Sequence, residues 1–141
     1  GECLVQALEG LLRNELVPLQ QDPELVSYAP KLKKGDGIID WSRPALEVHN
    51  HIRAMHPWPG ACFDWPRPDG KGQVRVQVYP GRLGPKHGPS APKPGTILEP
   101  QGGELPIACQ DRTYLVQTVK PSSGRAMSAR EFACGYLRQS S

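Results

Sequence analysis

A short run of lysines is the feature of this sequence that most directly suggests chemistry. Lys31, Lys33 and Lys34 follow one another closely on a segment that prolines and glycines keep out of regular structure. Such a run is usually a solvated stretch of charge, but ammonium groups on an extended chain also bind the phosphates of a polyanion. The other cations that we expect to contact phosphate are Arg75, Arg82 and Lys86.

Catalytic and metal-binding patterns are missing from the sequence. It has no G-x-S-x-G, G-x-G-x-x-G, phosphate-loop or H-E-x-x-H motif. The four cysteines do not form close pairs, and no histidine completes a Cys/His pattern, so we expect no metal site. Cys62 is expected to be an inert thiol of the core, in a strand beside Phe63. We therefore predict no catalytic or cofactor-binding residue in this chain.

The formal net charge of +3 conceals an asymmetry along the chain. Residues 1–27 carry one basic and five acidic side chains, net −4, and residues 28–141 carry sixteen basic and nine acidic ones, net +7. This split favours contact between the second part and a polyanion, although a domain with scattered lysines remains the alternative. With no apolar run of membrane length and no secretory signal, we expect a cytoplasmic protein with free thiols.

Helical periodicity and proline positions predict the helices and the linker. A leucine stripe predicts a helix over residues 2–16, and prolines and glycines make residues 17–37 a linker. A second helix is predicted over residues 44–55, with Ser42 as its N-cap. A last helix is predicted from Ser128, which begins a capping box.

Short alternating segments separated by turns predict a β domain over residues 38–141. The predicted strands are 61–65, 73–79, 96–99, 105–109 and 114–119, with a turn over 69–72. The Pro- and Gly-rich segment 80–95 is predicted as a loop, either disordered or a basic arm. We predict a mainly β fold with flanking helices, an OB-fold-like, five-stranded, partly open barrel; an SH3-like barrel stays open.

The aromatic side chains are predicted to lie in the core or in turns rather than on a stacking surface. This prediction concerns Trp41, Trp58, Phe63, Trp65, Phe132 and Tyr136. Trp58 and its flanking prolines are expected to fix a helix-to-strand corner, with a direct RNA contact as the alternative. Cations without a stacking surface are typical of proteins that read structured RNA by shape.

Five motifs, in order and spacing, carry a resemblance to a known family. They are Tyr28-Ala-Pro-Lys-Leu32, Gly37-Ile-Ile-Asp-Trp-Ser-Arg-Pro-Ala45, Ile52-Arg-Ala-Met-His-Pro-Trp-Pro-Gly-Ala61, Lys93-Pro-Gly-Thr-Ile-Leu98 and Met127-Ser-Ala-Arg-Glu-Phe132. Over residues 24–137 the sequence resembles the C-terminal domain of methionyl-tRNA formyltransferase. The predicted helix over residues 2–16 resembles the last helix of that family's catalytic domain, and would be a remnant of that domain.

The resemblance implies a function for the whole protein and a role for the linker. The full protein would transfer a formyl group from 10-formyltetrahydrofolate, its co-substrate, to the amino group of methionyl initiator tRNA in translation initiation. Its catalytic residues belong to an N-terminal domain, so this chain alone would be inactive. Lys31, within the Tyr-Ala-Pro-Lys motif, and Lys33 and Lys34 after it would face the tRNA. The implied partners are the initiator tRNA and the N-terminal catalytic domain, and we expect a monomer.

Two departures and two alternatives remain. The segment Lys34-Gly35-Asp36-Gly37 is less acidic than the family commonly is there, and the Pro-rich loop gives Arg82 and Lys86 no motif position from which to inherit a role. The first alternative is another enzyme of the superfamily, a formyltransferase acting on a nucleotide-linked amino sugar or 10-formyltetrahydrofolate hydrolase; the linker lysines and the net charge of +7 after residue 28 favour the tRNA enzyme. A purely structural module is the second alternative.

Overall fold

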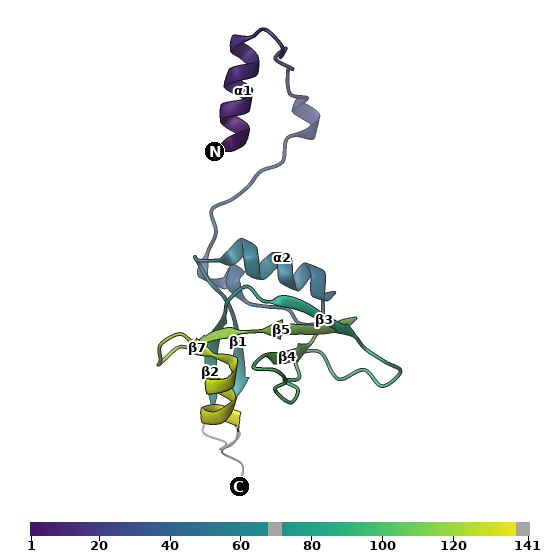
Figure 1. The fold of residues 1–141 in the computed structure, drawn as a ribbon, viewed down its shortest axis with the longest axis vertical. Coiled ribbons are helices and arrows are strands. Elements are labelled where there is room, and N and C mark those ends of the chain that lie inside the picture. Colours follow the sequence, from purple (N-terminus) through teal and green to yellow (C-terminus); the bar gives the residue numbers. More distant parts are fainter. Residues whose placement is uncertain (68–71, 138–141) are drawn as a thin grey trace. The chain divides into compact units, whose positions relative to one another are not determined.

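The structure, a computed structural model, describes residues 1–67 and 72–137 (Figure 1). The chain divides into two compact units, Gly1–Lys31 and Leu32–Ser141, and we describe each by itself. The boundary between them falls inside the segment that the sequence predicts as a linker. Residues 69–71, which belong to a predicted turn, lie outside the described residues.

The first unit consists of the helix α1 (Glu2–Leu12), a 3-10 turn η1 (Pro23–Leu25) and irregular chain. The prediction that the helix continues to residue 16 is wrong. Asn14 adopts a φ of 55°, in the left-handed region, and such a residue commonly ends a helix. The leucine stripe that predicts this helix is exposed in the unit.

The second unit is built on two antiparallel sheets. In its described residues the strands are β1 (Ala61–Pro66), β2 (Gln73–Val78), β3 (Arg82–Lys86), β4 (Leu105–Ala108), β5 (Arg112–Val116), β6 (Thr118–Pro121) and β7 (Met127–Ser128). One sheet has the order β1-β2-β6-β7 and the other the order β3-β5-β4. The mainly β prediction is confirmed, and the described strands number seven, in two antiparallel sheets, instead of the predicted five.

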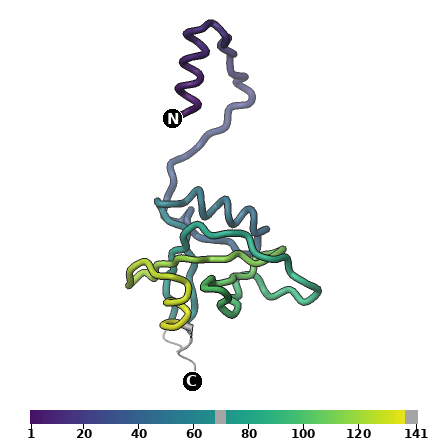
Figure 2. Tube along the Cα trace, in the orientation of Figure 1, coloured from purple at the N-terminus to yellow at the C-terminus, as the bar shows by residue number. Residues whose placement is uncertain are grey.

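The predicted loop over residues 80–95 contains a strand that the sequence pattern did not reveal. β3 pairs with β5, and its register shifts between Leu83 and Lys86, where Pro85 lies. Proline cannot donate to a ladder, so it is tolerated at a sheet edge or a bulge, and both conditions hold here. The part after β3 extends away from the sheets (Figure 2). It is attached at His87, whose N–H donates to the carbonyl of Asp111.

Two predicted strands differ from the observed ones. Residues 96–99 form no strand; Ile97 makes an isolated bridge to Ile107 beside β4. The predicted strand over 114–119 is divided at Gln117 into β5 and β6, which belong to different sheets. The polar pair Gln117-Thr118 interrupts the apolar run at this bend, but two polar residues alone do not show that the chain changes sheets.

The core of the second unit lies between α2 (Ala45–Met55) and the two sheets. Val48 and Ile52 of α2 are buried, as their spacing predicts, and the helix packs against β3 and β5 (Figure 1). The Trp41 ring meets Phe63 edge-on, with ring centroids 5.6 Å apart. At the other end, Phe132 of α3 (Ala129–Phe132) is fully buried; α3 leads into a π-helical turn over Ala133–Leu137.

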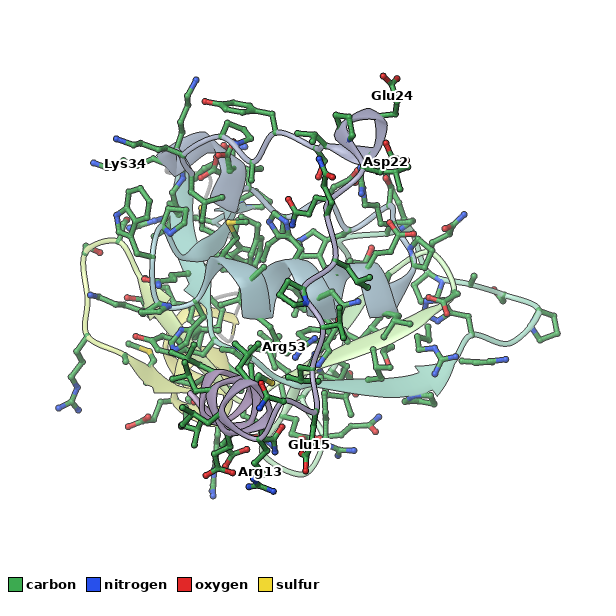
Figure 3. The ribbon with its side chains drawn as sticks, turned by 90° about the horizontal axis from the view of Figure 1, so that it is seen from above. Arg13, Glu15, Asp22, Glu24, Lys34 and Arg53 are labelled. Carbon is green, nitrogen blue, oxygen red and sulfur yellow. The ribbon has the colours of Figure 1, made fainter. Side chains whose placement is uncertain are left out.

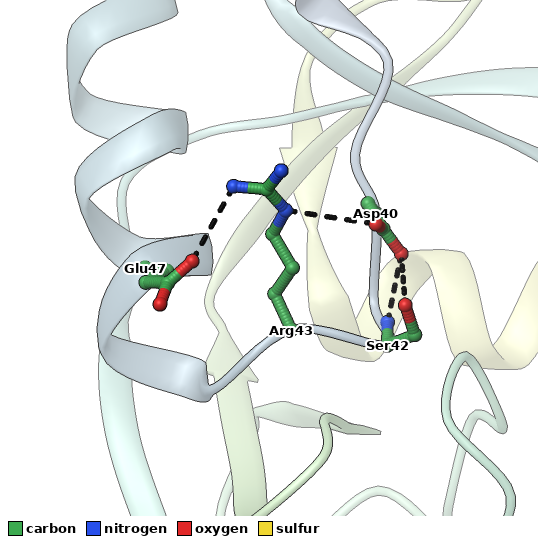
Figure 4. Close-up of polar contacts among 4 residues, drawn as sticks. All are labelled: Asp40, Ser42, Arg43 and Glu47. Carbon is green, nitrogen blue, oxygen red and sulfur yellow. Dashed lines mark hydrogen bonds and ion pairs between the residues drawn. The ribbon is translucent and has the colours of Figure 1, made fainter.

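The two predicted N-caps have different outcomes. The prediction for Ser42 is wrong: its hydroxyl donates to Asp40 instead, at 2.6 Å (Figure 4). The first N–H of α2, on Ala45, donates to the Asp111 carboxylate, which comes from a distant turn, at 2.8 Å. At α3 the capping box is confirmed, because the Ser128 hydroxyl accepts from the N–H of Glu131 at 3.2 Å.

Candidate nucleic-acid interface

Strand register creates a polar row on the outer face of the β1-β2-β6 sheet. Cys62, Gln77 and Lys120 are directly paired across these three strands. Their neighbours Phe63 and Val76 point the other way and are buried in the core. Because successive side chains of a strand alternate between faces, the row faces outward. It forms the floor of the candidate site.

A groove of ≈ 330 Å³ lies over this floor. Its walls combine cations, an aromatic ring and small polar groups. The lining residues are Lys34, Trp58, Pro59, Gly60, Cys62, Arg75, Gln77, Lys120, Pro121 and Ser122. Among these described residues there are three cations and no carboxylate, so the groove is suited to an anion.

The 3-10 turn η2 (Lys34–Gly37) brings Lys34 to the groove. The N–H of Ile39 donates to the carbonyl of Cys62 at 2.8 Å, which holds the chain after the turn against β1. A Cβ atom on Gly37 would collide with the carbonyl oxygen of Gly60, so the turn approaches the groove wall as closely as a glycine permits. Figure 3 labels Lys34 at the periphery of its unit.

Trp58 lies on the corner between α2 and β1, but its ring does not fill that corner. It is 58% exposed, whereas the predicted core aromatics Trp41, Phe63 and Trp65 are buried. The corner is closed by a hydrogen bond from the N–H of Gly60 to the carbonyl of Met55, at 2.9 Å. The ring of Trp58 is therefore free to form part of the groove wall.

The charge of Arg75 is offset by a neighbour on the next strand. Its guanidinium donates two hydrogen bonds of 2.8 Å to the two oxygens of Asp64. These bonds hold the pKa of Asp64 below its usual value and raise the pKa of Arg75. Both ions are partly exposed, and the pair leaves Lys34 and Lys120 as the main source of positive charge in the groove.

Cys62 lies on the groove floor without the properties of a nucleophile. Burial raises the pKa of its thiol, so the neutral form prevails near pH 7, but the predicted place in the core is wrong, because Cys62 lies on the outer face of the sheet. In the part of the chain that the structure describes, no group of three or more His, Cys, Asp or Glu side chains is placed to hold a metal ion. No described helix is long and apolar enough to cross a membrane.

The groove gathers two of the six predicted phosphate contacts, Lys34 and Arg75. Lys33 is the neighbour of Lys34 but does not line the groove, and Lys31 belongs to the first unit. The remaining two lie on β3 in the other sheet. There Arg82 forms an ion pair with Glu104, which also accepts a hydrogen bond from Gln117.

Two groove residues, Gln77 and Lys120, were not among the predicted contacts, and for Trp58 an RNA contact was only the alternative to a structural corner. Gln77 and Lys120 were detectable, because they are the polar members of alternating strands, next to Val76 and Val119. Trp58 carried no such signal, because the flanking prolines place it outside any periodic element.

The fold defines a class: a small, mainly β domain of two antiparallel sheets, with a helical segment before it in the sequence. Comparison with known families gives the particular member of that class. Residues 31–137 match the family described as "Formyl transferase, C-terminal domain", and the chain belongs to this family.

Individual relatives agree with this assignment. The chain is 44% identical over 137 residues to methionyl-tRNA formyltransferase of Nitratidesulfovibrio vulgaris (strain DP4), covering 97% of this chain and 41% of that protein. It is 33% identical over 136 residues to the enzyme of the same name from Pelobacter propionicus, covering 96% and 39%. The chain therefore corresponds to about two fifths of these relatives' length.

Solved structures give the same result at the level of fold. The chain is similar to HypX from Aquifex aeolicus, in a variant crystal structure, with a TM-score of 0.61 and 18% identity. The similarity covers 98% of this chain and 24% of HypX. At this identity the comparison establishes the shared fold alone.

Proposed function

We propose that this chain is the C-terminal part of a methionyl-tRNA formyltransferase, and that its second unit binds the tRNA. The observation that carries the proposal is the cationic groove over β1, β2 and β6, found in a chain whose relatives bear that enzyme's name. Backbone phosphates supply most of the affinity of proteins for nucleic acid. Within residues 1–67 and 72–137 no carboxylate pairs with Lys34 or Lys120, so these two groove cations keep their charge for a phosphate.

In this proposal the chain supplies affinity and orientation but no catalytic group. The full enzyme, in the cytoplasm, transfers the formyl group of 10-formyltetrahydrofolate to the amino group of methionine on initiator tRNA. The reacting groups belong to an N-terminal domain. When this chain binds the tRNA, the methionyl end of the same tRNA is kept close to the catalytic domain. Their encounter is then effectively intramolecular, which raises the rate of formyl transfer.

The oligonucleotide-binding architecture is part of the proposal. β5 passes into β6 across the single residue Gln117, so one bent segment contributes a strand to each sheet. A shared, bent strand of this kind is how the two halves of a small open barrel are joined.

A titration with initiator tRNA tests the tRNA-binding role. We expect binding that weakens as salt is raised, and weaker binding by the Lys34→Ala/Lys120→Ala variant. For that variant the slope of log affinity against log salt should be shallower by about 1.4 to 1.8, since two phosphate contacts are lost. The matched control is Lys93→Ala, an exposed lysine outside the groove lining, which should bind as the unaltered chain does.

Two outcomes would contradict the proposal. The first is no binding even at low salt, which is the result that a purely structural module gives. The second is an equal loss of tRNA affinity in the double variant and in the Lys93→Ala control, which would mean that only the overall charge of the chain matters. Variants of Lys31, Lys33, Arg82 and Lys86 in the same titration test the predicted contacts outside the groove and the linker.

A further inference from the structure

The exposed ring of Trp58 is not explained by phosphate binding. Phosphates are bound by cations and N–H groups, and an indole ring adds little to them. A large aromatic ring held in water beside cations is instead the combination by which proteins bind unpaired nucleotides, the base stacking on the ring and the backbone lying along the charges. In this groove the ring and the cations Lys34 and Lys120 line the same space.

The segment that carries Trp58 is restrained before any ligand binds. Pro57 and Pro59 flank it, and each proline fixes its own φ. Gly60, with a φ of +89°, brings the backbone so close to the Gln77 amide that a Cβ atom would collide with it. The backbone that carries the ring therefore loses little conformational freedom on binding, so more of the stacking energy remains as affinity.

The polar groups of the groove suit the edge of a base. The Gln77 amide offers one acceptor and two donor hydrogens, and Ser122 offers a hydroxyl that can act as either. The volume of ≈ 330 Å³ lies at the lower end of the roughly 300–1,000 Å³ of small-molecule sites. It therefore fits one nucleotide better than the side of a duplex, whose base faces are already stacked.

We propose, on the basis of the proposed function, that this groove takes a single unpaired nucleotide of the RNA. Its base stacks on Trp58, its edge meets Gln77, and its phosphate lies between Lys34 and Lys120. The domain thus recognises an unstacked position of the RNA, and not only the shape of a helix. This differs from the shape-based reading that the sequence suggests.

Binding of a short RNA followed by fluorescence tests the inference directly. The probe is an unstructured eight-nucleotide RNA of mixed sequence, compared with the blunt duplex that it forms with its complement. Trp41 and Trp65 are buried, so quenching on addition of the single strand reports Trp58. We expect quenching by the single strand and much weaker binding of the duplex.

Variants of the ring separate stacking from charge. Trp58→Leu should bind the single strand roughly 5- to 150-fold more weakly, the loss typical of one stacked base, and Trp58→Phe should keep most of the affinity. Lys34→Ala should weaken binding, and its neighbour Lys33→Ala, outside the groove, should not. Because Trp58 is exposed, its replacement leaves the core intact, and urea unfolding of each variant checks this.

Two results would overturn the inference. One is a Trp58→Leu variant that binds the single strand as the unaltered chain does. The other is a Trp58→Leu variant that loses affinity equally for the single strand and the duplex. The proposed function would survive either result if tRNA binding still depended on salt and were still weakened in the Lys34→Ala/Lys120→Ala variant. Loss of all tRNA binding at low salt would instead count against the proposed function itself.

Discussion

Tyr114 shows how one buried hydroxyl can join three parts of the second unit. The side chain is fully buried on β5, and its oxygen accepts a hydrogen bond from the N–H of Gly81 at 2.8 Å. The same oxygen lies 3.1 Å from Nδ1 of His49 on α2. A neutral His49 that accepts the hydroxyl proton at Nδ1 satisfies both groups, and so the network favours an uncharged imidazole.

His49 should make the stability of this domain depend on pH near neutrality. Burial, and secondly the charge of Arg53, lowers the pKa of His49 below the value of 6.5. As pH falls from 7.5 to 5.5, the unfolded chain takes up a proton at this residue more readily than the folded chain, so stability is lost. Urea unfolding at both pH values should show that the His49→Gln variant loses less free energy of unfolding between pH 7.5 and 5.5 than the unaltered chain. A loss as large as that of the unaltered chain would contradict this reading.

At the residue scale, burial was predictable from the sequence and exposure was not. The apolar members of alternating strands, such as Val76, and the helical stripe containing Ile52 are in the core as predicted. Trp58 was assigned to a corner by its type and its prolines, but the ring is exposed. Hydrophobicity identifies side chains that can be buried, and only the tertiary structure determines whether a neighbour is available to cover them.

At the scale of elements, α2 depends on a cap that comes from far along the chain. The Asp111 carboxylate accepts from the N–H of Ala45, which lowers the pKa of Asp111. Asp111→Ala should lower the free energy of unfolding by about 1 kcal/mol, the usual effect of losing a capping acceptor. Asp111→Asn keeps an acceptor and should lose less; both are measurable by urea unfolding. Equal losses would mean that the charge, not the hydrogen bond, matters.

The turn that carries Lys34 offers two glycines for comparison. A Cβ atom on Gly37 would collide with the Gly60 carbonyl, whereas one on Gly35 meets nothing within 4 Å. Gly37→Ala should push η2 away from the groove wall and weaken tRNA binding, and Gly35→Ala should leave it unchanged. The titration described above measures both. If Gly35→Ala weakened tRNA binding as much as Gly37→Ala, the close approach of Gly37 to the groove wall would not be the cause.

Elements with a strong local signal were predictable, and those defined by their partners were not. The capping box at Ser128 is local, and it was identified correctly. β3 is a strand only because β5 lies beside it, and its sequence of Arg, Leu, Gly, Pro and Lys has no alternation. The division of the chain at Gln117 depends likewise on which sheet each half joins.

At the scale of the whole molecule, the second unit has a complete core of its own. Its clustered buried residues lie between Ile39 and Phe132, and the first unit contributes none of them. A chain beginning at Leu32 should therefore unfold at the same urea concentration as the full chain. It should also self-associate less, because it lacks the exposed leucines of α1. Unfolding at clearly lower urea would show that the first unit supports the fold; light scattering checks association.

The position of η2 at the start of the second unit has a mechanical consequence. Lys34 lines the groove only two residues after the unit begins at Leu32. A ligand that holds Lys34 therefore also holds the anchor point from which the preceding chain departs. A ligand in the groove therefore reduces the number of conformations open to the preceding chain, and lowers its conformational entropy. RNA bound there, as proposed, would therefore restrict the preceding chain as well as bind the domain.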